Sequence, residues 1–239
     1  KNNIYKKIYK KIYKNLTLSI YKNNIYVADN IGFIYVIDLN SGKLIWIKNH
    51  GIPLKSKLKI FNNKIFVINQ DNRLLCFDIE KGSKIWDVRS VSSFIKSQVF
   101  FGLAISKKGE LVTLNSSGDL LKLEADNGRF YWSYKTTPTS MFAFDTDFFQ
   151  SSDIVIDDDD IIFASSSSIF SHNLVTGYLN WQKMIKSKNT PIIDGNNVFF
   201  VSDNGFFINL DRKSGKIIWS TNILKILKKK KQTTQITGF

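Results

Sequence analysis

Residues 36–46 read VIDLNSGKLIW, in which Asp38 is followed four positions later by Gly42 and, after four more, by Trp46. An acidic residue or Asn that bonds to its own backbone, followed by Gly, is typical of a tight turn between strands. The same spacing surrounds all five tryptophans of the chain. The signature positions are Asp38, Gly42, Trp46, Asp78, Gly82, Trp86, Glu124, Gly128, Trp132, Asn173, Gly177, Trp181, Asp211, Gly215 and Trp219.

Each signature completes a longer repeat. Up to its tryptophan, each repeat contains three β-rich segments, and a fourth apolar segment precedes these three. The turn between the first two of the three has a residue for which we expect positive φ, namely Gly32, Asn72, Gly118 or Gly205. Meanders of this kind with a Gly/Trp signature every ~40–50 residues are typical of β-propeller blades. The sequence therefore predicts an all-β fold: a β-propeller of four-stranded antiparallel blades, five of them in this chain.

Positive charge is concentrated at the two ends of the chain. The net charge is +14, and residues 1–14 and 225–231 contain no acidic residue. Such flanks can bind nucleic acid or an anionic membrane surface, and tyrosines between lysines can stack on bases. Solvated lysines at a strand edge or in a linker explain the same pattern, and we expect no nucleic-acid partner. Every apolar run is shorter than a membrane span.

The chain offers few groups for catalysis or for metal binding. Its single cysteine, Cys76, excludes an internal disulfide and is expected to be a buried, inert thiol. His172 occupies an apolar position of the repeat, which favours a hydrogen-bonded core residue over a general base, and we expect His50 to be exposed. Without a nucleophile–base pair or a phosphate loop, we predict no catalytic residue, no cofactor and no metal site.

The densest acidic cluster lies in residues 154–163, which read IVIDDDDIIF. In the alignment of the repeats, Asp157 to Asp160 fall where every other repeat has polar residues between its first two strands. We therefore interpret them as a hairpin turn. The four like charges repel one another there, and adventitious, weak binding of a divalent cation is an alternative interpretation.

The signature resembles the tryptophan-docking motif of PQQ-type propeller repeats, A-x-D-x-x-T/S-G-x-x-x-W. Residues 36–46 and 209–219 match it most closely, and the resemblance covers about residues 16–221. It implies that each tryptophan packs between neighbouring blades. The leading alanine of the motif is replaced here by Val36, Cys76, Lys122, Ser171 and Asn209.

PQQ-type blades occur in quinoprotein dehydrogenases and in cofactor-free scaffolds such as the BamB family, eight-bladed lipoproteins of the outer-membrane β-barrel assembly machinery. Many of the dehydrogenases stack their cofactor on a vicinal cysteine pair, which a chain with only Cys76 cannot form. The resemblance therefore implies a non-enzymatic, BamB-like scaffold at the periplasmic face of the bacterial outer membrane. The implied partner is the barrel-forming subunit, with membrane association only through a lipid anchor missing from this chain.

The alternative is a fragment of a PQQ-dependent quinoprotein dehydrogenase whose cofactor site lies outside this chain. For the domains, we expect a basic flank over residues 1–15, left from a preceding segment, and five blades over residues 16–223. Residues 224–239 are interpreted as a basic linker into a missing blade, so that the chain would be part of an eight-bladed ring.

The link between the third and fourth repeats is the longest. Aromatic and Met side chains in such a rim loop are typical protein–protein anchors, although an insertion that folds back over a blade edge would have the same composition. The second link contains Phe94 and is a weaker candidate. The partner-binding residues that we predict are Met141, Phe142, Phe144, Phe148, Phe149 and Phe94.

Overall fold

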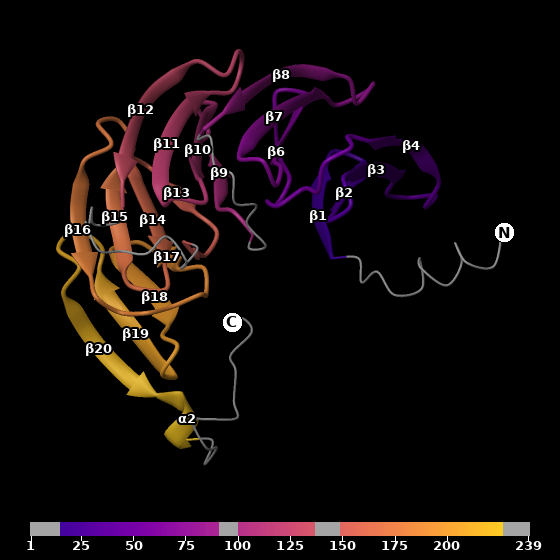
Figure 1. Ribbon diagram of the computed structural model, residues 1–239. Helices are drawn as coiled ribbons and strands as arrows, with labels where there is room; N and C mark the ends of the chain where they lie inside the picture. Colours follow the sequence, from indigo (N-terminus) through magenta and orange to yellow (C-terminus); the bar gives the residue numbers. More distant parts are fainter. Residues whose placement is uncertain (1–14, 91–99, 137–148, 227–239) are drawn as a thin grey trace, which may run out of the picture.

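The five predicted blades are present in the computed structural model, which describes residues 15–90, 100–136 and 149–226. Each blade is a four-stranded antiparallel sheet whose strands follow one another in chain order (Figure 1). The predicted all-β propeller fold is confirmed. The strands are β1 (Leu16–Tyr21), β2 (Asn24–Asp29), β3 (Phe33–Asp38), β4 (Leu44–Asn49), β5 (Lys59–Phe61), β6 (Lys64–Ile68), β7 (Arg73–Asp78), β8 (Lys84–Arg89), β9 (Leu103–Ile105), β10 (Glu110–Leu114), β11 (Asp119–Glu124), β12 (Phe130–Lys135), β13 (Val155–Asp157), β14 (Asp160–Ala164), β15 (Ile169–Asn173), β16 (Leu179–Lys183), β17 (Ile192–Asp194), β18 (Asn197–Val201), β19 (Phe206–Asp211) and β20 (Ile217–Asn222).

The blades stand side by side in an open arc (Figure 1). The first strand of each blade contacts the first strand of the next, from β1 through β5, β9 and β13 to β17. The fourth strands β4, β8, β12, β16 and β20 form the outer rim. A short helix, α2 (Ile223–Ile226), follows β20. In the part of the chain that the structure describes, no helix is long and apolar enough to cross a bilayer.

The turns have the backbone geometry that the sequence predicts. Gly32, Asn72, Gly118 and Gly205 have φ values of 110°, 56°, 79° and 78°. Glycine adopts this left-handed region without a steric penalty, and Asn is among the other residues that tolerate it. These residues therefore reverse the chain between the second and third strands of four blades.

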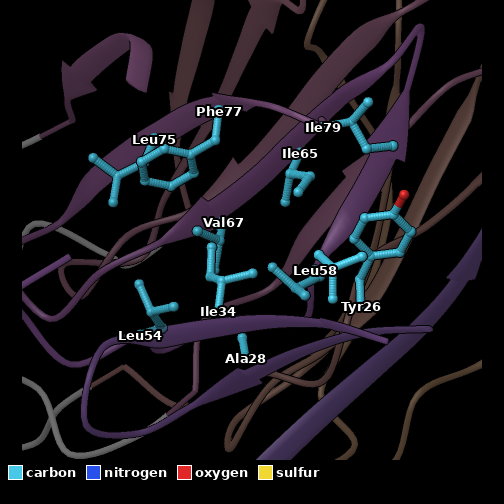
Figure 2. Packing of buried hydrophobic residues seen from close by; sticks show 11 residues of the cluster. Tyr26, Ala28, Ile34, Leu54, Leu58, Ile65, Val67, Leu75, Phe77 and Ile79 are labelled. Carbon is cyan, nitrogen blue, oxygen red and sulfur yellow. The ribbon is translucent and has the colours of Figure 1, made fainter. Parts of the chain in front are cut away.

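The core is formed between the blades. At the first junction, Tyr26 and Ile34 of the first blade face Val67 and Phe77 of the second, and all four are at most 3% exposed (Figure 2). Three further apolar clusters fill the other junctions. Because burial of a large apolar side chain contributes roughly 1.5–3 kcal/mol, adjacent blades stabilise each other.

Every blade has a register shift between its third and fourth strands. The shift falls in each case immediately after the residue that pairs with the signature tryptophan, as in the pair Val36 and Trp46. A bulge of this kind increases the local twist of a strand and redirects its side chains. The five shifts lie after Val36, Cys76, Lys122, Ser171 and Asn209.

Candidate functional site

The signature tryptophan of each of the first four blades docks on the signature glycine of the next blade. A Cβ atom added to Gly82 would lie 2.8 Å from the Trp46 ring, so only glycine permits this approach. The Trp46 indole N–H also donates to the Ile79 carbonyl at 3.2 Å. The other docked pairs are Trp86 on Gly128, Trp132 on Gly177 and Trp181 on Gly215, with indole donors to Ala125, Leu174 and Arg212 at 3.3, 3.2 and 2.7 Å.

The acidic residue of the signature shapes the turn that contains the glycine. The Asp38 carboxylate accepts hydrogen bonds from the Ser41 hydroxyl and from the Ser41 amide, both at 2.7 Å. These bonds, the one from the hydroxyl first, hold the pKa of Asp38 below its ordinary value. Asp211 and Ser214 repeat the arrangement in the last blade. Asp38 and Asp211 therefore act as turn-forming residues.

The acidic stretch 157–160 forms the predicted hairpin turn, with Asp157 paired to Asp160. The stretch also contacts the next blade through an ion pair, and the sequence did not predict this contact. The Arg212 guanidinium donates to the Asp157 carboxylate at 2.6 Å and to the Asp160 carboxylate at 2.7 Å. Across the described ranges, no group of three or more His, Cys, Asp or Glu is arranged to hold a metal ion. The stretch is thus an ionic contact between the fourth and fifth blades.

Lys122, which replaces the small residue of the motif, makes a second polar contact between blades. Its side chain is 7% exposed and lies 2.6 Å from the Glu110 carboxylate of its own blade. The Lys122 ammonium also donates to the Leu174 carbonyl of the fourth blade at 3.1 Å. The Trp132 indole donates to the same carbonyl. Lys122 therefore adds a polar contact to the junction of the third and fourth blades.

An ionic cluster joins three blades near the axis of the arc. The Asp153 carboxylate of the fourth blade lies 3.4 Å from the Lys57 ammonium and 3.2 Å from the Lys59 ammonium, both in the second blade. It also accepts the Leu103 amide of the third blade at 3.3 Å. Beside it lies a cavity of about 610 Å³, lined by Asn15, Leu16, Thr17, Lys57, Phe100, Phe101, Ser151, Ser152, Asp153, Lys188 and Thr190.

The two histidines and the cysteine pack among apolar side chains. His172 is fully buried, its Nδ1 lies 3.1 Å from the Gly177 carbonyl, and burial lowers its pKa to about 4. Burial raises the pKa of Cys76 to about 12, and the predicted burial of this thiol is confirmed. The expectation for His50 was wrong. Its ring is partly buried and packs against the Phe77 ring in a tilted arrangement with 4.0 Å between centroids, because the residue after β4 folds back onto the second blade.

The links between blades start from one face of the arc. In four of the five blades, the residue just after the outer strand donates its amide to the turn between the second and third strands of the same blade, as His50 does to Gly32 at 2.8 Å. Ser90 and Thr136 do the same to Asn72 and Gly118, at 3.0 and 3.1 Å. The first three links are therefore anchored where they leave their blades.

The predicted partner-binding residues belong to two of these links. Phe149 is partly buried and packs against the apolar cluster between the third and fourth blades. It therefore anchors the end of the third link to the core. Outside the described residues lie Met141, Phe142, Phe144, Phe148 and Phe94.

The part of the chain that matches known proteins is the part that forms the blades. A family model described as outer membrane protein assembly factor BamB matches residues 17–221. The outer membrane protein assembly factor BamB of Shewanella oneidensis is 23% identical over 208 residues, which cover 85% of this chain and 52% of that protein. The chain spans about half the length of the curated relatives it matches.

Solved structures of two functional classes share the fold. The crystal structure of BamB from Moraxella catarrhalis superposes with a TM-score of 0.72 at 15% identity, over 87% of this chain and 63% of that one. A quinohemoprotein alcohol dehydrogenase from Pseudomonas putida HK5 superposes with a TM-score of 0.69 at 16% identity, over 86% of this chain and 41% of the enzyme. At these identities the structural likeness establishes the blade architecture.

Proposed function

The chain belongs to the family of the outer membrane protein assembly factor BamB, and we propose from this premise that it is a non-enzymatic scaffold in the assembly of outer-membrane β-barrel proteins. Its place is the periplasmic face of the bacterial outer membrane. Its partner is the barrel-forming subunit of the assembly machinery. The observation that carries the proposal is the family match, which extends over all five blades.

The scaffold works by holding binding loops at fixed positions. Four Trp–Gly contacts, each with an indole hydrogen bond, join the blades. The first three links are anchored at their starting residues. The joined blades therefore hold the attachment points of these links at set distances from one another.

The contact itself is assigned to the link between the third and fourth blades. Phe149 is anchored in the core at the end of that link, so the preceding residues are tied to the arc on both sides. Buried aromatic anchors contribute most of the binding energy in many protein interfaces. We assign this role to Phe142 and Phe144, with an extended edge or loop of the partner as the complementary surface.

Quinoprotein chemistry is the second candidate, because the fold is shared with an alcohol dehydrogenase. The cavity beside Asp153, called the axial cavity below, is the place where binding of a cofactor can be tested. Its described residues do not fit the quinone site that the enzymes use: Cys76, the single cysteine of the sequence, is buried between blades, and Asp153 is the one carboxylate among the described lining residues. We therefore derive no catalytic step.

The proposal is tested by binding of the chain to the purified periplasmic domains of the barrel-forming subunit. The wild-type chain should bind, and the double variant Phe142→Ala, Phe144→Ala should bind at least ~10-fold more weakly, a loss of about 1.4 kcal/mol. Its melting temperature should be unchanged. Absence of binding by the wild type rejects the function. A large fall in melting temperature would instead show that the two rings belong to the core.

A matched control uses an exposed apolar side chain of a described strand. Ile85 is 46% exposed on an outer strand, so Ile85→Ala should leave binding unchanged. For the enzymatic alternative, the wild-type chain is titrated with pyrroloquinoline quinone and its tryptophan fluorescence is followed. Saturable quenching that Asp153→Asn weakens would support the quinoprotein candidate over the scaffold.

A further inference from the structure

A pocket at the junction of the first and second blades has no part in the scaffold function proposed above. It has a volume of about 410 Å³ and lies between the first link, which joins β4 to β5, and the strands β7 and β8. The junction is internal to the arc, with a described blade on each side (Figure 1). The volume is within the range of pockets that bind small molecules, ~300–1,000 Å³.

Two arginines of this pocket lie opposite each other. Arg73 on β7 pairs in register with Arg89 on β8. Like charges directly opposite on antiparallel strands are destabilising. At the equivalent positions the third blade pairs Asp119 with Lys135, which have opposite charges, and none of the other three blades has two charged residues there. Among the five described blades, the second therefore has an unusual concentration of positive charge at this place.

Asp87 offsets only part of that charge. Its carboxylate accepts hydrogen bonds from the Arg73 guanidinium and from the Lys84 ammonium, the latter at 2.5 Å. These bonds, the one from Lys84 first, hold the pKa of Asp87 below its ordinary value. One carboxylate is thus shared by two cations. The exposed Arg89 side chain makes no hydrogen bond or ion pair within the part of the chain that the structure describes.

His50 adds an unsatisfied polar atom to the lining. Its Nε2 atom is buried and has no hydrogen-bond partner among the described residues. Burial, and after it the charge of Lys48, lowers the pKa of His50, so the imidazole is neutral at pH 7. A buried polar atom without a partner is costly. A ligand oxygen beside the ring would remove this cost after a rotation of the imidazole.

The rest of the wall is apolar. Leu75 and Phe77 are 6% and 1% exposed and belong to the apolar cluster of the first junction (Figure 2). Ile52 of the first link is partly buried and also lines the pocket. An apolar wall with a few convergent charged groups is typical of a site for a small molecule.

The charges of the lining indicate the class of ligand. Three cationic and two acidic side chains of the described residues line the pocket, which leaves one positive charge when His50 is neutral. They are Arg73, Lys84, Arg89, Asp71 and Asp87. A single carboxylate matches this balance better than a doubly charged phosphate does.

We propose that this pocket binds a small organic acid with one carboxylate and an apolar group. The carboxylate lies between Arg73 and Arg89, because the planar guanidinium group pairs with carboxylates in a bidentate manner. The apolar group packs against Ile52 and Leu75, beside the imidazole of His50. The site is separate from the proposed contact with the barrel-forming subunit.

The two histidines of the chain allow a direct test by NMR. Titration with N-acetyl-leucine at constant pH should shift the imidazole signals of His50 until they saturate. The signals of His172, which is buried between the third and fourth blades, should not move. N-acetyl-leucinamide is the neutral match and should bind at least ~10-fold more weakly, because hydrogen bonds to a charged group are the stronger ones.

Two variants place the ligand at the arginine pair. Arg89→Gln should bind N-acetyl-leucine at least ~10-fold more weakly. Its melting temperature should not fall, because the change removes two like charges that face each other. Lys135→Gln makes the same kind of change at the equivalent position of the third blade, and its binding should equal that of the wild type.

A short peptide that ends in leucine separates two sources of the carboxylate. Binding of the peptide with a free terminus, but not of its amide, would assign the pocket to a chain end. Binding of N-acetyl-leucine alone would assign it to a free acid, and the proposal holds with either source.

Four results would overturn the proposal. These are no saturable shift of the His50 signals, equal binding of the acid and the amide, wild-type affinity in Arg89→Gln, and tighter binding of inorganic phosphate than of N-acetyl-leucine. Arg89→Gln should still bind the periplasmic domains of the barrel-forming subunit. Failure of the ligand site is therefore distinguishable from failure of the proposed function.

Discussion

At the residue scale, the signature glycines set how closely the blades approach. Gly177 has a φ of 78°, and a Cβ at this position would lie 2.7 Å from the Trp132 ring. Gly42 has a similar φ of 66°, but no described atom lies near its Cβ position. Both glycines therefore need the left-handed backbone, but only Gly177 also needs to lack a side chain so that a described ring can pack against it.

We expect Gly177→Ala to lower the free energy of unfolding more than Gly42→Ala. The left-handed backbone costs an alanine ~1–2 kcal/mol at either position. Displacement of the Trp132 ring adds about 1–3 kcal/mol at Gly177 alone. Urea denaturation of both variants measures the difference. Equal losses would show that the close approach of the ring is unimportant.

His172 makes stability depend on pH. Its pKa is about 4 in the folded chain, mainly through burial, against an ordinary value of 6.5. The unfolded chain therefore binds the proton at higher pH than the folded chain does. Stability is complete above pH 6.5 and falls as the pH decreases to about 4, by ~3 kcal/mol from this group.

The variant His172→Leu isolates that contribution. Leucine is the residue at the equivalent positions Leu123 and Leu210, so the side chain should fit the site. Denaturation curves recorded between pH 4 and 7 should show a smaller pH dependence than the wild type. An unchanged dependence would assign the effect to other groups, such as His50, whose pKa is also lowered by burial.

At the element scale, the sequence predicted the strands, the turns and the packing of tryptophans between blades, but not the polar contacts between blades. The spacing of Gly32 and Gly118 was sufficient to predict positive φ, because turn geometry depends on a few neighbouring residues. The partner of Asp157 and Asp160 could not be predicted in this way, because Arg212 lies more than fifty residues further along the chain. His50 was misjudged for the same reason, since its ring packs on another blade.

The hairpin 157–160 should therefore contribute to the junction of the last two blades. Arg212→Met should lower the free energy of unfolding by about 2 kcal/mol, because it leaves two partly buried carboxylates without their cation. Arg129 forms a more exposed ion pair with Glu124, with an Arg side chain 64% exposed. Arg129→Met should cost less than about 1 kcal/mol. Similar losses in the two variants would contradict a specific role for Arg212.

At the scale of the whole molecule, repetition explains why so much of the fold was predictable. One nine-residue signature recurs in all five blades, so each blade supports the interpretation of the others. The candidate binding residues were less predictable, because they lie in links that differ in length and composition. Phe149 is an example. Its aromatic side chain in a link favoured a partner contact, but in the structure it packs against the core.

In the proposed function, the chain binds the barrel-forming subunit through the link between its third and fourth blades. Amide hydrogen exchange of the chain, with and without the periplasmic domains of that subunit, tests it most directly. We predict slower exchange in peptides that cover residues 137–150 and little change in the outer strands. Unchanged exchange throughout the chain, or protection confined to the axial cavity around Asp153, would contradict the claim.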